Sequence, residues 1–405
     1  MPTTCEIDFE NNPLKVIYAG QLLRGTVQLT STEEKNVRGV YICIHGKAHC
    51  YWTEGSGDNR RTYSGDEDYL NERTYFVGGN SGEIRLSPGS YNYSFQCMLP
   101  PGLPTSFEGE IGYIRYTARV VLDIPLWPDK SFEVPFTVIK AINLNADPRL
   151  KEPAIVEQNK TFSLCCLLCC CSSDPMRIIA RTPVGGYAPG QIINLEINVK
   201  NESDQPVSEF TVQLIKQINY HTHAGSARQK HETISIIEQD TRGCDVSQEE
   251  IIRVNMEVPP IPPTDFDTSN IVKVRYSIRI IGSVACCHNN PVIDLPITIG
   301  SYPIQDASPA YAGYPIGYQQ SIGYPHPNNI QTDNIISQQP SAPQLTDQSN
   351  FSTLPYPSAA PNAPFQFPNE DPPTYEEAVI KGGEGDNFKP KYPMFKRNTS
   401  YSSGN

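Results

Sequence analysis

Five cysteines crowd into one short stretch and form the densest group of reactive side chains in the sequence. They are Cys165, Cys166, Cys169, Cys170 and Cys171, interleaved with leucines. An exposed cysteine close to a bilayer can accept a palmitoyl chain, which adds apolar surface for membrane binding. We favour this interpretation of the cysteine cluster, as a candidate site of reversible lipidation.

Two other interpretations of the cluster stay open. The spacing of Cys166 and Cys169 suits a pair of zinc ligands if Cys286 and Cys287 complete the site, and small apolar residues also suit a buried strand. His221, His223 and His231 have a spacing that metal ligands can use, although a solvated polar face explains them better. We expect no metal and no cofactor.

The sequence lacks the common catalytic motifs. It contains no GxSxG, GxxxxGK[ST], GxGxxG or HExxH pattern. Paired carboxylates such as Glu33–Glu34 and Glu249–Glu250 lie in polar stretches typical of solvated loops. We therefore expect that the protein is not an enzyme.

A short proline motif near the C-terminus suits recognition by another protein. Pro372-Pro373-Thr374-Tyr375 has the PPxY form that WW domains bind. Its prolines hold the backbone near polyproline II before binding, which lowers the cost of ordering, and Tyr375 fills a second pocket. Pro372, Pro373 and Tyr375 are thus the candidate WW-binding residues.

A second tetrapeptide lies in the same part of the chain. Pro340, Ser341, Ala342 and Pro343 form a PSAP sequence, the form read by the ubiquitin-variant domain of the ESCRT budding machinery. Composition alone makes this tetrapeptide rarer than PPxY in a proline-rich tail. We interpret it as a candidate ESCRT-binding site.

Short segments rich in β-branched and aromatic residues, separated by turn residues, recur through the first 300 residues. No stretch keeps the apolar spacing of an amphipathic helix, so the pattern indicates antiparallel sandwiches rather than βαβ units. The candidate strands are 20–29, 37–44, 90–98, 114–124 and 132–139 in the first half, and 191–199, 209–217, 233–238, 251–258, 272–280 and 291–299 in the second.

The fold class predicted is therefore all-β, with two immunoglobulin-type β-sandwich domains. Turn and breaker residues at Asn145-Ala146-Asp147-Pro148 place the boundary, which gives sandwiches over 5–146 and 153–300 and a hinge over 147–152. Beyond Gly300 the sequence is rich in Pro, Tyr and Gln and poor in Val and Leu. Residues 301–405 are predicted to be a disordered tail, because they cannot bury enough apolar surface to offset the entropy of ordering.

Charge and hydropathy limit the surroundings of the chain. Its 32 Lys and Arg against 44 Asp and Glu give a net charge of −12, which argues against binding to nucleic acid. The first 12 residues do not resemble a signal peptide, and the longest apolar run, 164–171, is shorter than the roughly 20 residues that cross a bilayer. We expect a cytoplasmic protein whose membrane contact is peripheral.

Three stretches carry a resemblance to a known family. They are YAGQ at 18–21, LSPGSYNYSFQCMLPPGLPTSFEGEIGYIRY at 86–116, which is the most specific, and GGYAPGQ at 185–191. In residues and order they resemble the α-arrestins, the arrestin-domain-containing proteins. The resemblance covers about residues 5–300 and implies two arrestin-like sandwiches joined by a short hinge.

The resemblance also implies a function as an adaptor. Family members use PPxY to recruit WW-domain HECT-type E3 ubiquitin ligases to membrane cargo, such as receptors and transporters, for ubiquitination, endocytosis and endosomal sorting at the plasma membrane and endosomes. Pro372, Pro373 and Tyr375 take that role here, although members often carry two PPxY motifs and this chain has one. The alternative is a retromer-like coat or scaffold subunit in endosomal sorting, which would not need the tail.

Overall fold

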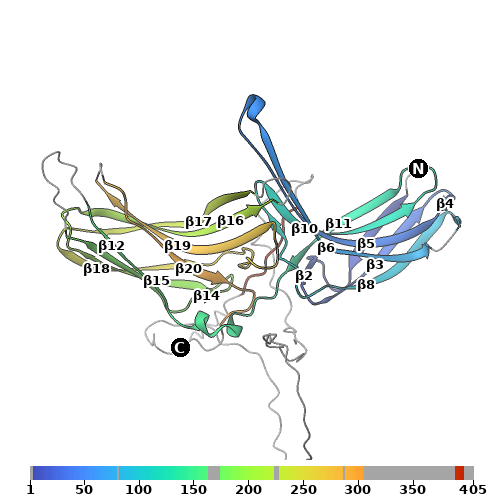
Figure 1. Cartoon of the computed structure of the whole chain (residues 1–405). Coiled ribbons are helices and arrows are strands. Elements are labelled where there is room, and N and C mark those ends of the chain that lie inside the picture. Colours follow the sequence, from blue (N-terminus) through green and yellow to red (C-terminus); the bar gives the residue numbers. More distant parts are fainter. Residues whose placement is uncertain are drawn as a thin grey trace, which may run out of the picture. The chain divides into compact units, whose positions relative to one another are not determined.

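The computed structural model describes residues 3–79, 82–162, 174–222, 228–285, 288–304 and 388–395 (Figure 1). Strands dominate these residues, and the helices among them are three short 3-10 helices: η1 (Gly57–Asn59), η2 (Leu144–Ala146) and η3 (Pro148–Lys151). The prediction of an all-β fold with two sandwiches is confirmed. No helix in the described ranges is long and apolar enough to cross a bilayer.

The first sandwich packs a three-stranded sheet against a larger one. Phe9 of the small sheet lies 5.6 Å, centroid to centroid, from Phe136 of the large sheet. It also contains a two-stranded sheet of β4 (Lys35–Val37) and β7 (Ile84–Leu86). The short β9 (Phe107–Glu108) pairs with β10. The small sheet has the order β1 (Thr4–Phe9), β3 (Leu22–Ser31), β8 (Gly89–Met98), and the large sheet β2 (Val16–Tyr18), β11 (Lys130–Ile139), β10 (Gly112–Asp123), β5 (Gly39–Glu54), β6 (Arg61–Gly78).

The second sandwich has the same kind of layers. One sheet has the order β12 (Ala154–Lys160), β13 (Met176–Thr182), β15 (Ile192–Asn201), β18 (Gln248–Glu257). The other has the order β14 (Gly186–Tyr187), β20 (Val292–Ile299), β19 (Val272–Val284), β16 (Val207–His221), β17 (Gln229–Cys244). η2 and η3 lie between the last strand of the first sandwich and β12.

The large sheets of the two sandwiches repeat one plan. In each, a short first strand runs parallel to its neighbour, β2 beside β11 and β14 beside β20, and the remaining pairs are antiparallel. A buried tyrosine in the equivalent strand closes a proline-rich loop in each. Tyr116 donates a hydrogen bond to the carbonyl oxygen of Pro104 at 2.7 Å, and Tyr276 donates to that of Pro262 at 2.7 Å.

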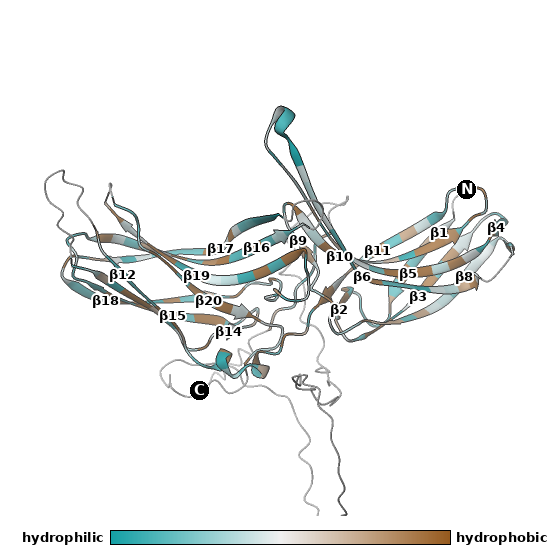
Figure 2. Ribbon diagram, viewed as in Figure 1, coloured by the Kyte–Doolittle hydropathy of each residue, from teal (hydrophilic) through white to brown (hydrophobic). Residues whose placement is uncertain are grey.

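Strand alternation explains how the cores form. Along β3, the fully buried Leu23, Val27 and Leu29 alternate with exposed polar residues such as Gln28. Successive side chains of a strand point to opposite faces, so this sequence places one apolar face inward. Figure 2 shows the same mixture of hydrophobic and hydrophilic residues along most strands.

The long strand β6 has no counterpart among the predicted strands. Its sequence, RTYSGDEDYLNERTYFVG, is polar and lacks the alternation of a half-buried strand. It forms because it continues β5 as a hairpin, with Glu54 opposite Arg61 and Gly39 opposite Gly78. The tip of this hairpin, which includes η1, is exposed and hydrophilic (Figures 1 and 2).

Part of the predicted tail lies against the sandwiches. Residues 388–395, which we call the tail strap, form hydrogen bonds with both sandwiches and are drawn in red in Figure 1. Residues 301–304 follow β20 after Gly300, and the ring of Tyr302 lies tilted against that of Tyr18, 6.1 Å away between centroids. The rest of the predicted tail lies outside the described residues.

We predict that the two tyrosine-to-loop hydrogen bonds stabilise their sandwiches to a similar extent. Tyr116→Phe or Tyr276→Phe removes the donor and leaves a buried carbonyl unsatisfied, which should lower the free energy of unfolding by about 1–2 kcal/mol. Calorimetry should report the loss as a lower midpoint of thermal unfolding. Tyr51→Phe, at a side chain that is 49% exposed, is the control, and equal midpoints for all three variants would contradict the prediction.

Candidate functional site

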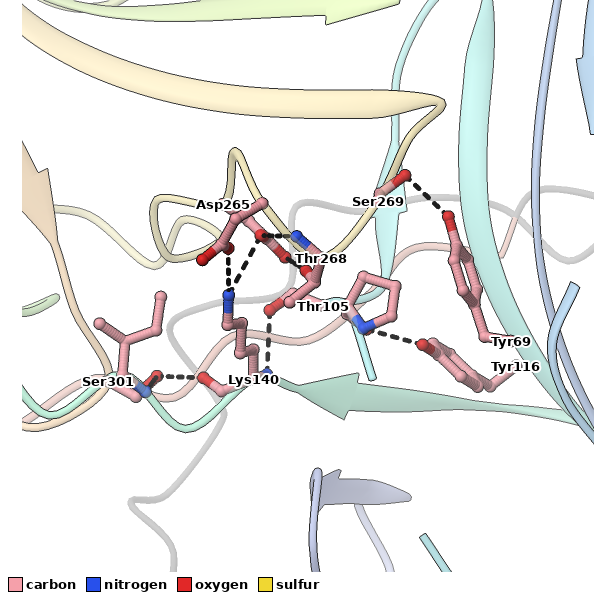
Figure 3. Close-up of polar contacts among 11 residues, drawn as sticks. Tyr69, Thr105, Tyr116, Lys140, Asp265, Thr268, Ser269 and Ser301 are labelled. Atoms are coloured by element: carbon pink, nitrogen blue, oxygen red, sulfur yellow. Dashed lines mark hydrogen bonds and ion pairs between the residues drawn. The ribbon is translucent and has the colours of Figure 1, made fainter. Parts of the chain in front are cut away.

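A lysine of the first sandwich is held by two carboxylates of the second. Lys140 follows the end of β11, and its Nζ lies 3.3 Å from Oδ1 of Asp265 (Figure 3). The same Nζ lies 2.7 Å from Oδ1 of Asp267. Both aspartates belong to the loop between β18 and β19. The backbone N–H of Thr268 donates to Asp265 Oδ1 at 3.3 Å, and the Thr268 hydroxyl donates to Oδ2. We call these four residues the polar junction.

The two carboxylates of the polar junction differ in burial. The side chain of Asp265 is 8% exposed and that of Lys140 is 17% exposed, whereas Asp267 is 68% exposed. The hydrogen bond from Lys140 holds the pKa of Asp267 below its ordinary value, because it favours the charged carboxylate. Asp265 is therefore the partner whose charge most needs Lys140, since water reaches it least.

Backbone contacts fix Lys140 in place. Its N–H donates to the hydroxyl of Thr105 at 3.0 Å, and its carbonyl oxygen accepts from the hydroxyl of Ser301 at 2.6 Å (Figure 3). Thr105 belongs to the proline-rich loop of the first sandwich, and Ser301 follows the last strand of the second. The lysine is thus positioned by both sandwiches before its side chain reaches the carboxylates.

A second set of contacts holds the other end of the same loop. The hydroxyl of Tyr69, in β6, lies 2.7 Å from the hydroxyl of Ser269 (Figure 3). It donates to Glu67 Oε2 at 2.7 Å. Glu67 also accepts from the backbone N–H of Asn270 at 2.9 Å and from its side chain at 2.6 Å. Burial raises the pKa of Tyr69 well above its ordinary value, which further favours the protonated hydroxyl.

These contacts define what the site can do. Its charged groups are used in ion pairs and hydrogen bonds that join the sandwiches. Among the described residues there is also no group of three His, Cys, Asp or Glu side chains that could hold a metal ion. The arrangement suits a rigid connection between the two sandwiches.

The site residues predicted from the sequence are not among these residues. Pro372, Pro373 and Tyr375, the tetrapeptide 340–343 and the cysteine cluster all fall outside the described residues, as do His223, Cys286 and Cys287. The polar junction was not predicted. The only signal was the acidic pair Asp265 and Asp267 in a loop between prolines and a strand, and nothing in the sequence pairs it with a lysine 125 residues away.

Comparison with known proteins agrees with this architecture. Residues 5–145 match the N-terminal domain of arrestin (S-antigen), and residues 172–304 match its C-terminal domain. The chain is 30% identical over 308 residues to arrestin domain-containing protein 17 of Caenorhabditis elegans, which covers 72% of this chain and 69% of the relative.

The chain belongs to the α-arrestin family of arrestin-domain-containing proteins. Arrestin domain-containing protein 4 of Mus musculus is 26% identical over 307 residues, covering 73% of this chain and 71% of the relative. Arrestin domain-containing protein 1 of Rattus norvegicus is 23% identical over 289 residues, covering 71% of this chain but only 62%, less than two thirds, of the relative. This α-arrestin is an adaptor of the arrestin type, and such adaptors act by binding partner proteins.

We predict that Lys140→Met weakens the connection between the sandwiches. The substitution leaves the buried Asp265 without its cation, which should cost about 3 kcal/mol and separate the calorimetric unfolding of the α-arrestin into two transitions. Adding Asp265→Asn should recover part of the loss, because the uncompensated charge is then removed. Lys230→Met, at an exposed lysine of β17, is the control. A single transition at an unchanged midpoint in Lys140→Met would disprove the role of the pair.

Proposed function

We propose that this α-arrestin recruits WW-domain HECT-type E3 ubiquitin ligases to membrane cargo. The observation that carries the proposal is a PPxY motif, at Pro372, Pro373 and Tyr375, in the same chain as two arrestin sandwiches. The sandwiches would hold a receptor or transporter, and the motif would bring the ligase. Tethering then raises the concentration of the ligase near lysines of the cargo.

The proposal extends to the sorting steps that follow ubiquitination. The PSAP sequence at residues 340–343 would bind the ubiquitin-variant domain of the ESCRT machinery, which links the modified cargo to endosomal sorting. Both motifs rest on short linear sequences that need no fold of their own. The chain would then work at the cytoplasmic face of the plasma membrane and of endosomes.

We predict that the PPxY motif accounts for binding to WW domains. Full-length chain carrying Tyr375→Ala or Pro373→Ala should bind isolated WW domains of a HECT-type ligase at least about tenfold more weakly, because the aromatic pocket or the polyproline contact is lost. Isothermal titration provides the affinities. Pro343→Ala, in the PSAP tetrapeptide, is the matched control and should leave WW binding unchanged. Undiminished binding by the Tyr375→Ala chain would refute the proposal.

A peripheral membrane contact is part of the proposal and has support on the surface. Leu126 and Trp127, in the turn between β10 and β11, are 101% and 76% exposed. Tryptophan favours the boundary between lipid headgroups and acyl chains. Two large apolar side chains at the tip of one turn can therefore enter a bilayer surface, and lipidation of the cysteine cluster would strengthen that contact.

We predict that this turn contributes to vesicle binding. Leu126→Ser with Trp127→Ala should reduce co-sedimentation of the full, unlipidated chain with phosphatidylcholine vesicles by about threefold or more, because apolar area is lost from the interface. Ile155→Ser removes an apolar side chain of β12 that is 57% exposed and is the control. If the double variant sediments with vesicles as the unaltered chain does, the turn is not the membrane contact.

A further inference from the structure

The tail strap connects the two sandwiches through three hydrogen bonds. The backbone N–H of Lys391 donates to the hydroxyl of Thr137 at 3.1 Å, and the hydroxyl of Tyr392 donates to the carbonyl oxygen of Ser106 at 2.9 Å. Thr137 and Ser106 belong to the first sandwich. The backbone N–H of Phe395 donates to the carbonyl oxygen of Pro189, in the second sandwich, at 3.0 Å.

Tyr392 is the anchor of the strap. As a whole residue it is half-buried, but its hydroxyl lies in the interior, and burial raises its pKa well above the ordinary value. The negative charge of the Glu108 carboxylate also raises the pKa of the Tyr392 hydroxyl. Tyr392 and Pro393 border a small hollow whose other walls are largely apolar, formed by Ile139, Pro189, Ile261, Pro263, Gly300 and Ser301.

The second sandwich is shaped to receive the strap at Gly190. This glycine has a φ of +88°, and a Cβ atom there would meet the backbone of Phe395. The equivalent turn of the first sandwich contains Gly20, with a φ of +89°, and a Cβ atom there would lie 3.5 Å from Pro101 of the same sandwich. In the first sandwich a proline of its own loop lies over the turn, whereas in the second the strap lies there.

The contacts specify a class of ligand. Two backbone N–H groups of an extended segment are satisfied, one tyrosine hydroxyl reaches a buried carbonyl, and the following proline fixes φ before binding. We infer that the groove between the sandwiches, bounded by Ser106, Thr137 and Pro189–Gly190, is a binding site for an extended Tyr-Pro peptide. Its occupant in this chain is the tail strap, which exchanges with an identical peptide added in trans.

The hydroxyl contact also excludes a modified ligand. A phosphate on Tyr392 would replace the hydroxyl donor with acceptor oxygens facing the carbonyl oxygen of Ser106, and two acceptors cannot share a hydrogen bond. The site is therefore specific for unphosphorylated tyrosine. This inference is independent of the PPxY motif, because neither the groove nor the strap includes a residue of that motif.

The test is a binding experiment on the full chain with its groove open and filled. A fluorescein-labelled peptide with the sequence of residues 386–397 is titrated with the unaltered chain and with a double variant carrying Tyr392→Ala and Phe395→Ala. We call this double variant the opened chain, because its strap should no longer fill the groove. Anisotropy should show saturable binding to the double variant, and an apparent affinity for the unaltered chain at least about tenfold lower, because the tethered strap competes. The phosphotyrosine peptide and a Tyr→Ala peptide should not bind the double variant.

A groove-side substitution keeps the test specific. Thr137→Val, added to the opened chain, removes the acceptor for the Lys391 N–H while keeping a β-branched side chain in β11, and should weaken peptide binding by about fivefold. Peptides around Tyr314-Pro315, Tyr324-Pro325 and Tyr356-Pro357, taken from the same tail, should compete less well than the strap peptide. Equal competition by all of them would overturn the assignment of the strap as occupant.

Three further results would overturn the inference. The first is that the peptide shows no saturable binding to a folded opened chain. The second is that it binds the opened and the unaltered chain equally well, and the third is that the phosphopeptide binds as tightly as the plain peptide. If the opened chain does not fold, hydrogen exchange on the unaltered chain decides instead. The amides of Lys391 and Phe395 should then exchange at least about tenfold more slowly than in the free peptide, and exchange at the free-peptide rate would overturn the inference.

Discussion

The connection between the two sandwiches depends on one ammonium group that is largely removed from water. Lys140 compensates the charge of Asp265, and the loop that carries Asp265 is also tied to β6 through Ser269 and Asn270. A buried carboxylate without a cation is unfavourable. The pair therefore favours the one arrangement in which the end of β11 meets the loop before β19.

The two sandwiches share one plan and differ in the contacts that their proline-rich loops make. Each has a parallel first strand, a proline-rich loop and a tyrosine that closes it, so the cores are built by the same rules. The differences lie in what those loops do at the connection. The loop of the first sandwich supplies Thr105 and Ser106, which position Lys140 and the tail strap, whereas the loop of the second supplies the acidic residues that bind the lysine.

Local patterns predicted the sheets where one face is buried and the other is solvated. The predicted segment 20–29 overlaps most of β3 and 272–280 forms part of β19, because their apolar residues alternate. β6 was missed, since its polar residues are held in a strand by pairing with β5 rather than by a buried face. The polar junction and the seat of the tail strap could not be predicted for a related reason: each joins residues more than a hundred positions apart, and no local pattern reports such pairs.

The anchored strap also sets a distance for the rest of the tail. Phe388 lies only 13 residue steps after Tyr375, and a fully extended chain of that length spans at most about 45 Å. Measured from Ile304 instead, the 71 intervening steps would allow about 250 Å. Under the proposed function, a ligase bound at the PPxY motif would therefore stay close to the two sandwiches while the strap is in place, and the substrate lysines within its reach would form a much smaller zone.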